Sequence, residues 1–150
     1  MLRQRIADAT KDAMKAQDKA RLSALRMVSA AITNADIEAR GQGKAPAGDD
    51  ALLSLLGKLV KQRQEAAELY DKGGRAELAA QERAEIEVIR AFMPEQMSDD
   101  DVRAAIAAAI GQTGATSVKD MGKVMAALKA THAGKMDFAA ASGLVKQMLG

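Results

Sequence analysis

Apolar residues recur every three or four positions along most of the chain, which is the spacing of one buried face of an α-helix. This pattern predicts four longer helices within residues 1–94 and three shorter ones within residues 98–150. β-branched and aromatic residues, which favour strands, are sparse. The sequence therefore predicts an all-α protein, in which longer helices form an N-terminal helical hairpin or bundle and a small three-helix C-terminal domain follows.

Helix-capping and helix-breaking residues predict where the first four helices begin and end. Asp18 is a suitable N-cap for the second helix, because its carboxylate can accept hydrogen bonds from free N–H groups. Three Gly and one Pro within residues 41–48 predict a loop before the third helix. The other predicted limits are Asp49–Asp50 at the start of the third helix, Gly73–Gly74 at its end, and Pro94 at the end of the fourth, which carries Phe92 on its apolar face.

Residues 95–97 predict a boundary between an N-terminal helical domain, 1–94, and a small C-terminal helical domain, 98–150. Ser98 can cap the helix that follows, and the three Asp residues after it complement the positive end of that helix. Ser117 and Asp120 have the spacing of a capping box, in which both side chains bond to backbone N–H groups. Gly134 is expected to end the helix that this capping box starts, and Asp137 is expected to cap the last helix of the chain.

The composition excludes several kinds of catalytic or metal site. The chain has 150 residues, with 33 Ala, one His and no Cys or Trp. Without Cys there is no disulfide, thiol nucleophile or Cys-ligated iron–sulfur cluster. His132 alone cannot build a zinc site of four ligands, and no nucleophile-elbow sequence accompanies it for a Ser-His-Asp triad. Its place near a helix end predicts that it helps to satisfy terminal carbonyl groups. We expect no metal and no cofactor.

Motifs for phosphate chemistry and membrane insertion are also missing from the sequence. No Gly-Lys pair is followed by the Ser or Thr of a P-loop. No run of about 18 apolar residues is present, and Met1–Leu2–Arg3 leads into a charged periodic segment rather than an apolar signal core. We therefore expect a cytoplasmic protein with no membrane partner and no catalytic centre of its own.

Positive charge is concentrated in two regions of the chain. The net charge is only +2, but residues 1–30 carry seven basic and three acidic side chains. From Val102 onward there are six basic and two acidic side chains. Local positive potential favours polyanion binding, and an ordinary hydrated surface is the alternative. Because only 2% of the residues are aromatic, base stacking is disfavoured, and a folded RNA recognised by shape is the more compatible target.

Four segments carry a recognisable pattern: RLSALRMVSAAI at 21–32, KLVKQRQEAAELYDKGGRAELAAQERAEIEVIRAFMPEQ at 58–96, SVKDMGKVMAALKATHAGKMD at 117–137 and LVKQML at 144–149. Together they resemble the GatB/YqeY family over nearly the whole chain. That family includes small free-standing proteins, the kind this chain resembles. It also includes the tail of the B subunit of a glutamine-dependent amidotransferase, which converts Glu-tRNA(Gln) or Asp-tRNA(Asn) to the amide form. In the amidotransferase the tail contacts the outer corner of tRNA, and the chemistry lies in other domains and subunits.

The resemblance implies a tRNA-binding surface in the C-terminal domain. The segment from Lys119 to Met125 matches the DMGKVM-type element of the family, and Gly134–Lys135 match its Gly-Lys turn. Gly122 lacks a side chain, which permits close approach either by another helix or by a ribose-phosphate. Phe92–Met93 depart from the usual Tyr-Leu, and the residues after Lys135 vary the usual sequence. The expected nucleic-acid-binding residues are Lys119, Gly122, Lys123, Lys129, Gly134, Lys135 and Lys146.

A second basic cluster lies in the N-terminal domain, at Lys58, Lys61 and Arg63. It overlaps the KQR element of the family. The more favoured role of this element is structural, because Arg63 can pair with Glu82 or Glu85 on the neighbouring helix.

Three functions follow from these observations. The leading one is a non-catalytic tRNA-binding accessory protein, linked to tRNA-dependent amidotransferase function and holding backbone phosphates near the tRNA elbow. The alternative is a protein-interaction module that docks on an amidotransferase or a synthetase without contacting RNA. A third, an enzyme with amidotransferase activity of its own, is opposed by the lack of an ATP site, a glutaminase triad and a metal site in the sequence.

Overall fold

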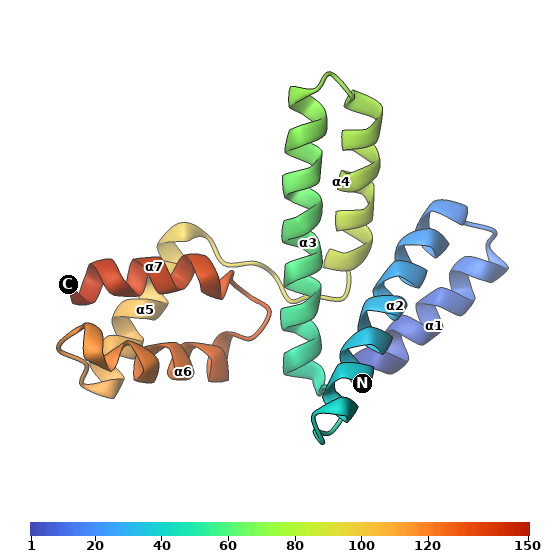
Figure 1. The fold of residues 1–150 in the computed structure, drawn as a ribbon. Helices are drawn as coiled ribbons and strands as arrows, with labels where there is room; N and C mark the ends of the chain where they lie inside the picture. The colour runs from blue at the N-terminus through green and yellow to red at the C-terminus, as the bar shows by residue number, and fades with distance from the viewer. The chain divides into compact units, whose positions relative to one another are not determined.

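The computed structural model describes residues 1–150 and contains seven α-helices, one 3-10 turn and no strand (Figure 1). The prediction of an all-α protein is confirmed. The chain divides into two compact units, Met1–Pro94 and Glu95–Gly150, which we call unit 1 and unit 2. No helix combines the length and the apolar character that a membrane span requires.

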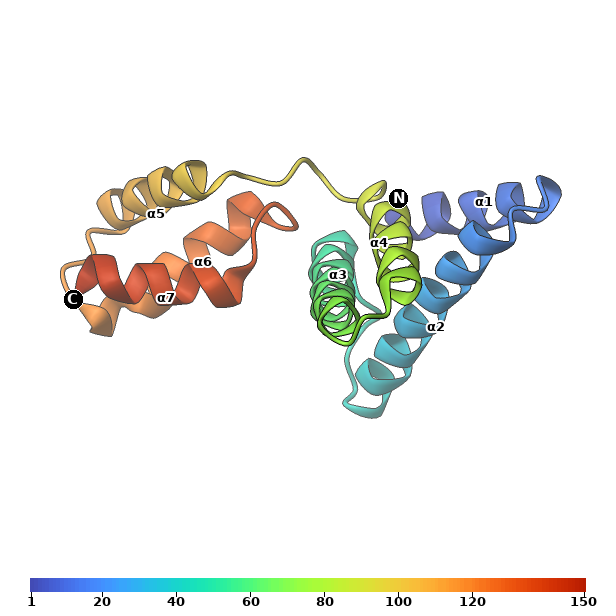
Figure 2. The same cartoon turned by 90° about the horizontal axis from the view of Figure 1, so that it is seen from above.

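Two helical hairpins build unit 1. Helices α1 (Leu2–Lys15) and α2 (Lys19–Gly41) form the first, and α3 (Asp49–Lys72) and α4 (Ala76–Arg90) form the second. Helix α2 packs against both helices of the second hairpin, and seen from above it passes beside α4 (Figure 2). The core that results buries Leu25, Val28, Leu52, Leu56 and Ile89, each at most 1% exposed.

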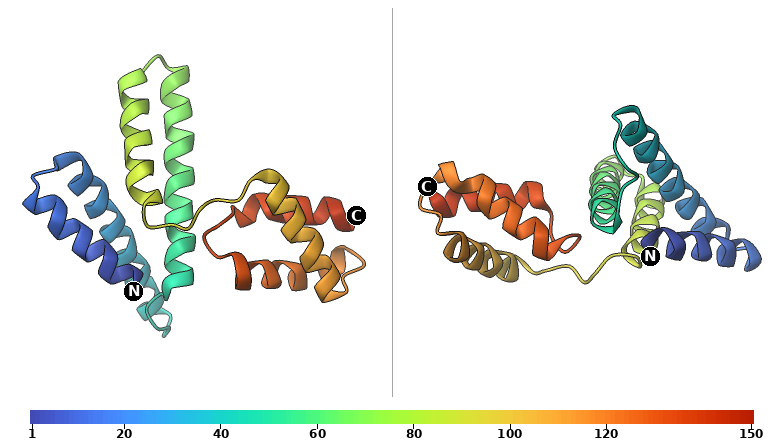
Figure 3. Two further views of the ribbon diagram at one scale, coloured as in Figure 1. Left: turned by 180° about the vertical axis from the view of Figure 1, so that it is seen from behind. Right: turned by 90° about the horizontal axis from the view of Figure 1, so that it is seen from below.

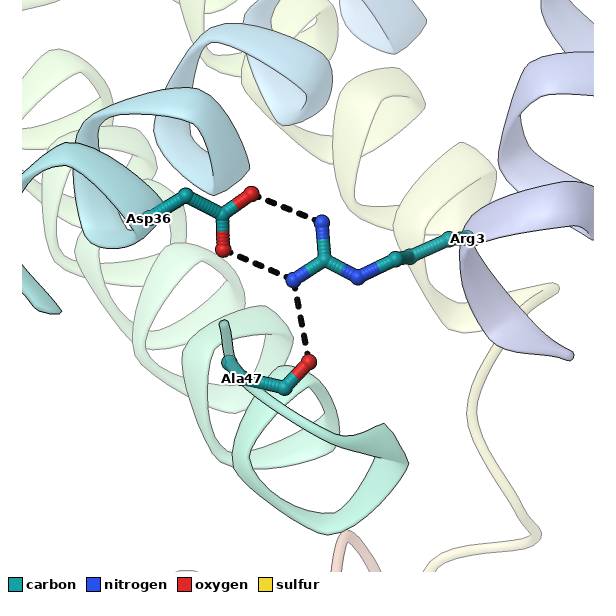
Figure 4. Close-up of polar contacts among 3 residues, drawn as sticks. All are labelled: Arg3, Asp36 and Ala47. Carbon is teal, nitrogen blue, oxygen red and sulfur yellow. Dashed lines mark hydrogen bonds and ion pairs between the residues drawn. The ribbon is translucent and has the colours of Figure 1, made fainter. Parts of the chain in front are cut away.

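Arg3 joins three parts of unit 1. Its guanidinium donates two hydrogen bonds of 2.7 Å to the Asp36 carboxylate on α2, and one of 2.9 Å to the carbonyl oxygen of Ala47 in the loop before α3 (Figure 4). The hydrogen bonds from Arg3, opposed in part by burial, hold the pKa of Asp36 below its usual value. One side chain thus fixes the start of α1 against α2 and against the loop that leads into α3.

Ion pairs link α3 to α4 across the second hairpin. Nε of Arg63 lies 3.1 Å from Oε2 of Glu85, which confirms the predicted pairing of Arg63 with an acid of the neighbouring helix. Nearer the turn, Arg83 donates a hydrogen bond to Asp71 and lowers the pKa of that carboxyl. Gly74 has φ +72°, a conformation that favours glycine, and the predicted stop at Gly73–Gly74 is confirmed.

Unit 2 consists of an antiparallel helical pair crossed by a third helix. Helix α5 (Asp99–Thr113) crosses one face of the pair formed by α6 (Met121–His132) and α7 (Phe138–Leu149), as two views show (Figures 1 and 3). A 3-10 turn (Val118–Asp120) leads into α6. The outward faces of α6 and α7 stay exposed. The core of the unit contains Ile106, Val124, Leu128, Ala141 and Val145, each at most 1% exposed.

Three predicted N-caps are confirmed. The Asp18 carboxylate, the Ser98 hydroxyl and the Asp137 carboxylate each accept a hydrogen bond from a backbone N–H in the first turn of α2, α5 and α7, at 3.1, 3.1 and 2.9 Å. Each bond satisfies an N–H group that has no partner within its own helix.

The capping box predicted at Ser117 and Asp120 is wrong in one half. The Ser117 side chain makes no capping bond, whereas the Asp120 carboxylate accepts a hydrogen bond of 3.0 Å from the N–H of Thr116. The residues between them form the 3-10 turn, so the α-helix begins at Met121 rather than at Val118.

The fourth helix ends earlier than Pro94 predicts. Helix α4 stops at Arg90, and the N–H groups of Phe92 and Met93 then donate to carbonyl oxygens three residues back. Because a proline disfavours helical geometry at the residue before it, the chain leaves the helix through this tighter turn. Phe92 lies outside the helix but is still buried, at 7% exposure.

Candidate nucleic-acid interface

The exposed face of α6 carries lysines separated by small residues. Buried Val124 and Leu128 anchor the opposite face of the helix in the core. At 3.6 residues per turn, five exposed positions lie within about a third of the helix circumference. They are Gly122, Lys123, Ala126, Lys129 and Ala130. Thr131, near the end of the helix, is exposed outside this third, and Lys119 is exposed in the turn that precedes α6.

Asp120 fixes the start of this face. Its carboxylate accepts a hydrogen bond of 3.0 Å from the N–H of Thr116, and this bond, with the nearby charge of Lys123, lowers the pKa of Asp120. The ionised carboxylate therefore holds the 3-10 turn that carries Lys119. Lys119 and Lys123 consequently flank the point where α6 begins.

The turn between α6 and α7 presents Lys135 at the surface. Gly134, which precedes it, has φ +75°. The N–H of Lys135 donates to the carbonyl of His132, and the carbonyl of Lys135 accepts a bond from the N–H of Met97, both at 3.0 Å. The Lys135 side chain is exposed, whereas the next residue, Met136, is 8% exposed in the core. The remaining predicted lysine, Lys146, is exposed in the last turn of α7.

None of these five lysines forms an ion pair. Five of the six acids of unit 2 lie at the starts of its helices, and the sixth, Glu95, is exposed in the segment before α5. Residues 99–101 lie in the first turn of α5, while Asp120 and Asp137 accept bonds from backbone N–H groups. The lysine charges are thus free of ion-pair partners, the state in which they attract a polyanion most strongly.

Gly122 does not serve helix packing within the chain. A Cβ atom placed there meets no heavy atom within 4 Å, so the alternative of a tight helix contact is wrong for the folded chain. Gly111 on α5 and Gly143 on α7 are surrounded by the same open space. A glycine inside a helix costs about 1 kcal/mol relative to alanine, and no contact of unit 2 accounts for that cost.

The structure brings the predicted residues together in part. Lys119, Lys123 and Lys129 lie along α6 and the turn before it, and Gly134 and Lys135 lie in the turn that follows. Lys146 belongs to a different helix, α7. All seven predicted residues therefore lie on consecutive elements of unit 2.

His132, the only histidine, lies in the last turn of α6. The Nδ1 atom of His132 lies 2.7 Å from the Thr131 hydroxyl. The ring lies at a helix end as predicted, but its hydrogen bond is to a hydroxyl rather than to a helix-terminal carbonyl group. No group of three or more His, Cys, Asp or Glu residues is arranged to hold a metal ion.

Three residues of this surface were missed in the sequence. Ala126 and Ala130 follow Gly122 at steps of four, so helical spacing alone could have found the small-residue line between the lysines. Gln96 donates a hydrogen bond of 2.6 Å to the carbonyl of Gly134, which is 38 residues away. No local pattern signals a contact over that separation.

The fold and this surface define the class of the protein: a small all-α protein of two helical units, the second of which exposes unpaired lysines. The chain matches the model of the Yqey-like protein family over residues 3–149, and it belongs to that family.

Relatives in fungi are similar to part of the chain. Altered inheritance of mitochondria protein 41 of Eremothecium gossypii is 35% identical over 83 residues, which cover 55% of this chain and 44% of that protein. The protein of the same name from Lachancea thermotolerans is 34% identical over 83 residues, covering 55% and 43%. An uncharacterized protein of Schizosaccharomyces pombe is 32% identical over 89 residues, covering 59% and 68%. The similarity thus spans less than half the length of the first two, whose names place them in mitochondria.

Proposed function

We propose that this chain is a non-catalytic accessory protein that binds the phosphate backbone of folded tRNA. The binding surface, which we call the lysine surface, consists of Lys119, Lys123, Lys129, Lys135 and Lys146. The observation that carries the proposal is that all five side chains are exposed and free of ion pairs within one small unit. Lysine contacts to phosphates supply affinity and orientation without reading sequence.

The shape of the lysine surface supports a backbone ligand. Between the lysines of α6 the exposed positions are Gly122, Ala126 and Ala130, so little side-chain bulk keeps a ribose-phosphate away from the helix. The chain offers few aromatic rings on which bases could stack. These features favour a folded RNA held from outside over an unpaired strand.

The link to tRNA-dependent amidation comes from the resemblance to the amidotransferase tail. On that basis the tRNA elbow is the proposed contact, and the ATP- and glutamine-dependent chemistry belongs to other proteins. An amidotransferase or a synthetase is a further proposed partner. A cytoplasmic location stays a prediction, since the named relatives are mitochondrial.

The proposal is tested by titrating folded total tRNA with the full chain, followed by fluorescence anisotropy at several salt concentrations. We expect saturable binding whose logarithmic affinity falls linearly with the logarithm of salt concentration, because phosphate contacts release counterions. Absence of binding at low salt contradicts the proposal. In that case nuclease-resistant co-purification with an amidotransferase or synthetase would favour the protein-interaction alternative.

A matched pair of variants locates the surface. Lys123→Glu with Lys135→Glu is expected to weaken binding by at least about tenfold and to reduce the salt slope by about two, since two phosphate contacts are lost. Lys44→Glu with Lys72→Glu changes the net charge equally at two exposed positions of unit 1, outside the basic cluster at Lys58, Lys61 and Arg63. If both double variants weaken binding alike, overall charge rather than the lysine surface is responsible.

A further inference from the structure

The turn that carries Lys135 is bonded to the segment that enters unit 2. The side-chain amide of Gln96 donates to the carbonyl of Gly134 at 2.6 Å, and the N–H of the next residue, Met97, donates to the carbonyl of Lys135 at 3.0 Å. Two successive residues thus bond to two successive carbonyl groups. Without Gln96, the Gly134 carbonyl loses this side-chain bond.

These bonds restrain the backbone of Lys135 on both sides. Its N–H is bonded to the His132 carbonyl and its carbonyl to the Met97 N–H, and Met136 anchors the following residue in the core. Lys135 therefore combines a restrained backbone with an exposed side chain. A residue held in this way loses less conformational freedom when it binds a ligand than one in a free turn.

We propose that Gln96 is a positioning residue, which holds the turn between α6 and α7 so that Lys135 is presented to an RNA phosphate. This inference rests on the proposed function, because it assigns a support to one member of the lysine surface. Gln96 itself makes no contact with the RNA. Its contribution passes through the Gly134 carbonyl and hence through Lys135.

The test is a double-mutant cycle on the full chain, with folded total tRNA as the probe. Gln96→Leu removes the donor at nearly constant size, and Lys135→Ala removes the phosphate contact. We expect Gln96→Leu to weaken tRNA binding about three- to tenfold in the parent chain, which is the size of effect seen between coupled neighbouring residues. In the Lys135→Ala background it should have no further effect, because the phosphate contact that Gln96 supports is already gone. Gln112→Leu makes the same chemical change at an exposed position of α5 where no hydrogen bond is lost, and it should leave binding unchanged.

The outcomes separate this inference from the proposed function. An equal loss in both backgrounds means that Gln96 acts on unit 2 as a whole and overturns the positioning role, as does the absence of any loss. Failure of the parent chain to bind tRNA overturns both proposals, whereas normal binding with an inert Gln96 overturns only this one. Circular dichroism checks the fold of each variant. If Gln96→Leu does not fold, Gln96→Asn replaces it, since the shorter side chain keeps the amide but falls short of the Gly134 carbonyl.

Discussion

At the scale of single residues, the contact between Arg3 and Asp36 makes stability depend on pH. The bonds from Arg3 lower the folded-state pKa of Asp36 from its usual 3.8. A carboxyl group with a lowered pKa stabilises the folded state fully when the pH is above the pKa of the unfolded state. This stabilisation is lost as the pH falls through the lower pKa of the folded state. The contact therefore contributes fully near neutral pH and fades in acid.

We expect Arg3→Met to lower the thermal midpoint by a few degrees near pH 7 and by less in acid, where Asp36 becomes protonated in the parent as well. Thermal unfolding followed by circular dichroism between pH 3 and 7 measures this difference. Arg26→Met, at an exposed arginine of α2 without an ion pair, is the control. If Arg3→Met lowered the thermal midpoint equally at every pH, the contact between Arg3 and Asp36 would not be the source of the pH dependence.

Gly122 permits a second prediction at the residue scale. Because a Cβ meets open space there, Gly122→Ala should stabilise unit 2 by up to about 1 kcal/mol through helix propensity. If a ribose-phosphate approaches α6 closely, the same substitution weakens tRNA binding severalfold. Urea unfolding and the anisotropy titration measure the two effects on one variant. A gain in stability with unchanged binding would remove Gly122 from the interface.

At the scale of helices, most of the fold could be predicted because the signals are local. Periodic apolar positions marked the helices, and Asp18, Ser98 and Asp137 marked their starts, since an N-cap acts on the turn next to it. The prediction at Ser117 was wrong because the residues after it fold into a 3-10 turn, which is stabilised by the Asp120 carboxylate rather than by the Ser117 side chain. Phe92 was assigned to α4 because burial continues past the helix end, and periodicity alone does not separate a helix from a buried turn.

The candidate interface could be predicted less completely than the helices. Lys123 and Lys129 share the exposed side of α6, and helical spacing gives that without a structure, whereas Lys119 lies in the 3-10 turn before this helix. The support of Lys135 by Gln96 and Met97 depends on how distant segments pack. Likewise, the absence of a neighbour around Gly122 is a property of the folded chain. Local pattern therefore finds the charges, while tertiary packing decides how each one is held.

The two serines predicted as caps give a matched test at the helix scale. Ser98 accepts a bond of 3.1 Å from the N–H of Asp101, whereas Ser117 makes no capping bond. We expect Ser98→Ala to reduce the free energy of unfolding of unit 2 by about 1 kcal/mol, and Ser117→Ala to change it by less than about 0.5 kcal/mol. Urea denaturation followed by circular dichroism compares them. Equal losses would mean that the Ser98 bond adds little to stability.

At the scale of the whole molecule, each unit has its own hydrophobic core. Leu25, Leu56 and Ile89 belong to the core of unit 1, and Ile106 and Val145 to that of unit 2. Units with separate cores are expected to unfold as separate cooperative systems. The chain contains one Tyr and no Trp. Because Tyr70 lies on α3 in unit 1, its fluorescence reports the unfolding of that unit alone, while circular dichroism reports the helices of both.

A pair of conservative core substitutions uses this difference between the probes. Ile106 and Ile89 are both fully buried, and an Ile→Val change removes one buried methylene at a cost of about 0.5–1.5 kcal/mol. Ile106→Val should move part of the circular dichroism transition to lower urea and leave the Tyr70 transition in place, whereas Ile89→Val should move the Tyr70 transition. If Ile106→Val shifts both probes equally, the two units unfold as one system. In that case the stability effects of Ser98→Ala and Gly122→Ala belong to the whole chain rather than to unit 2.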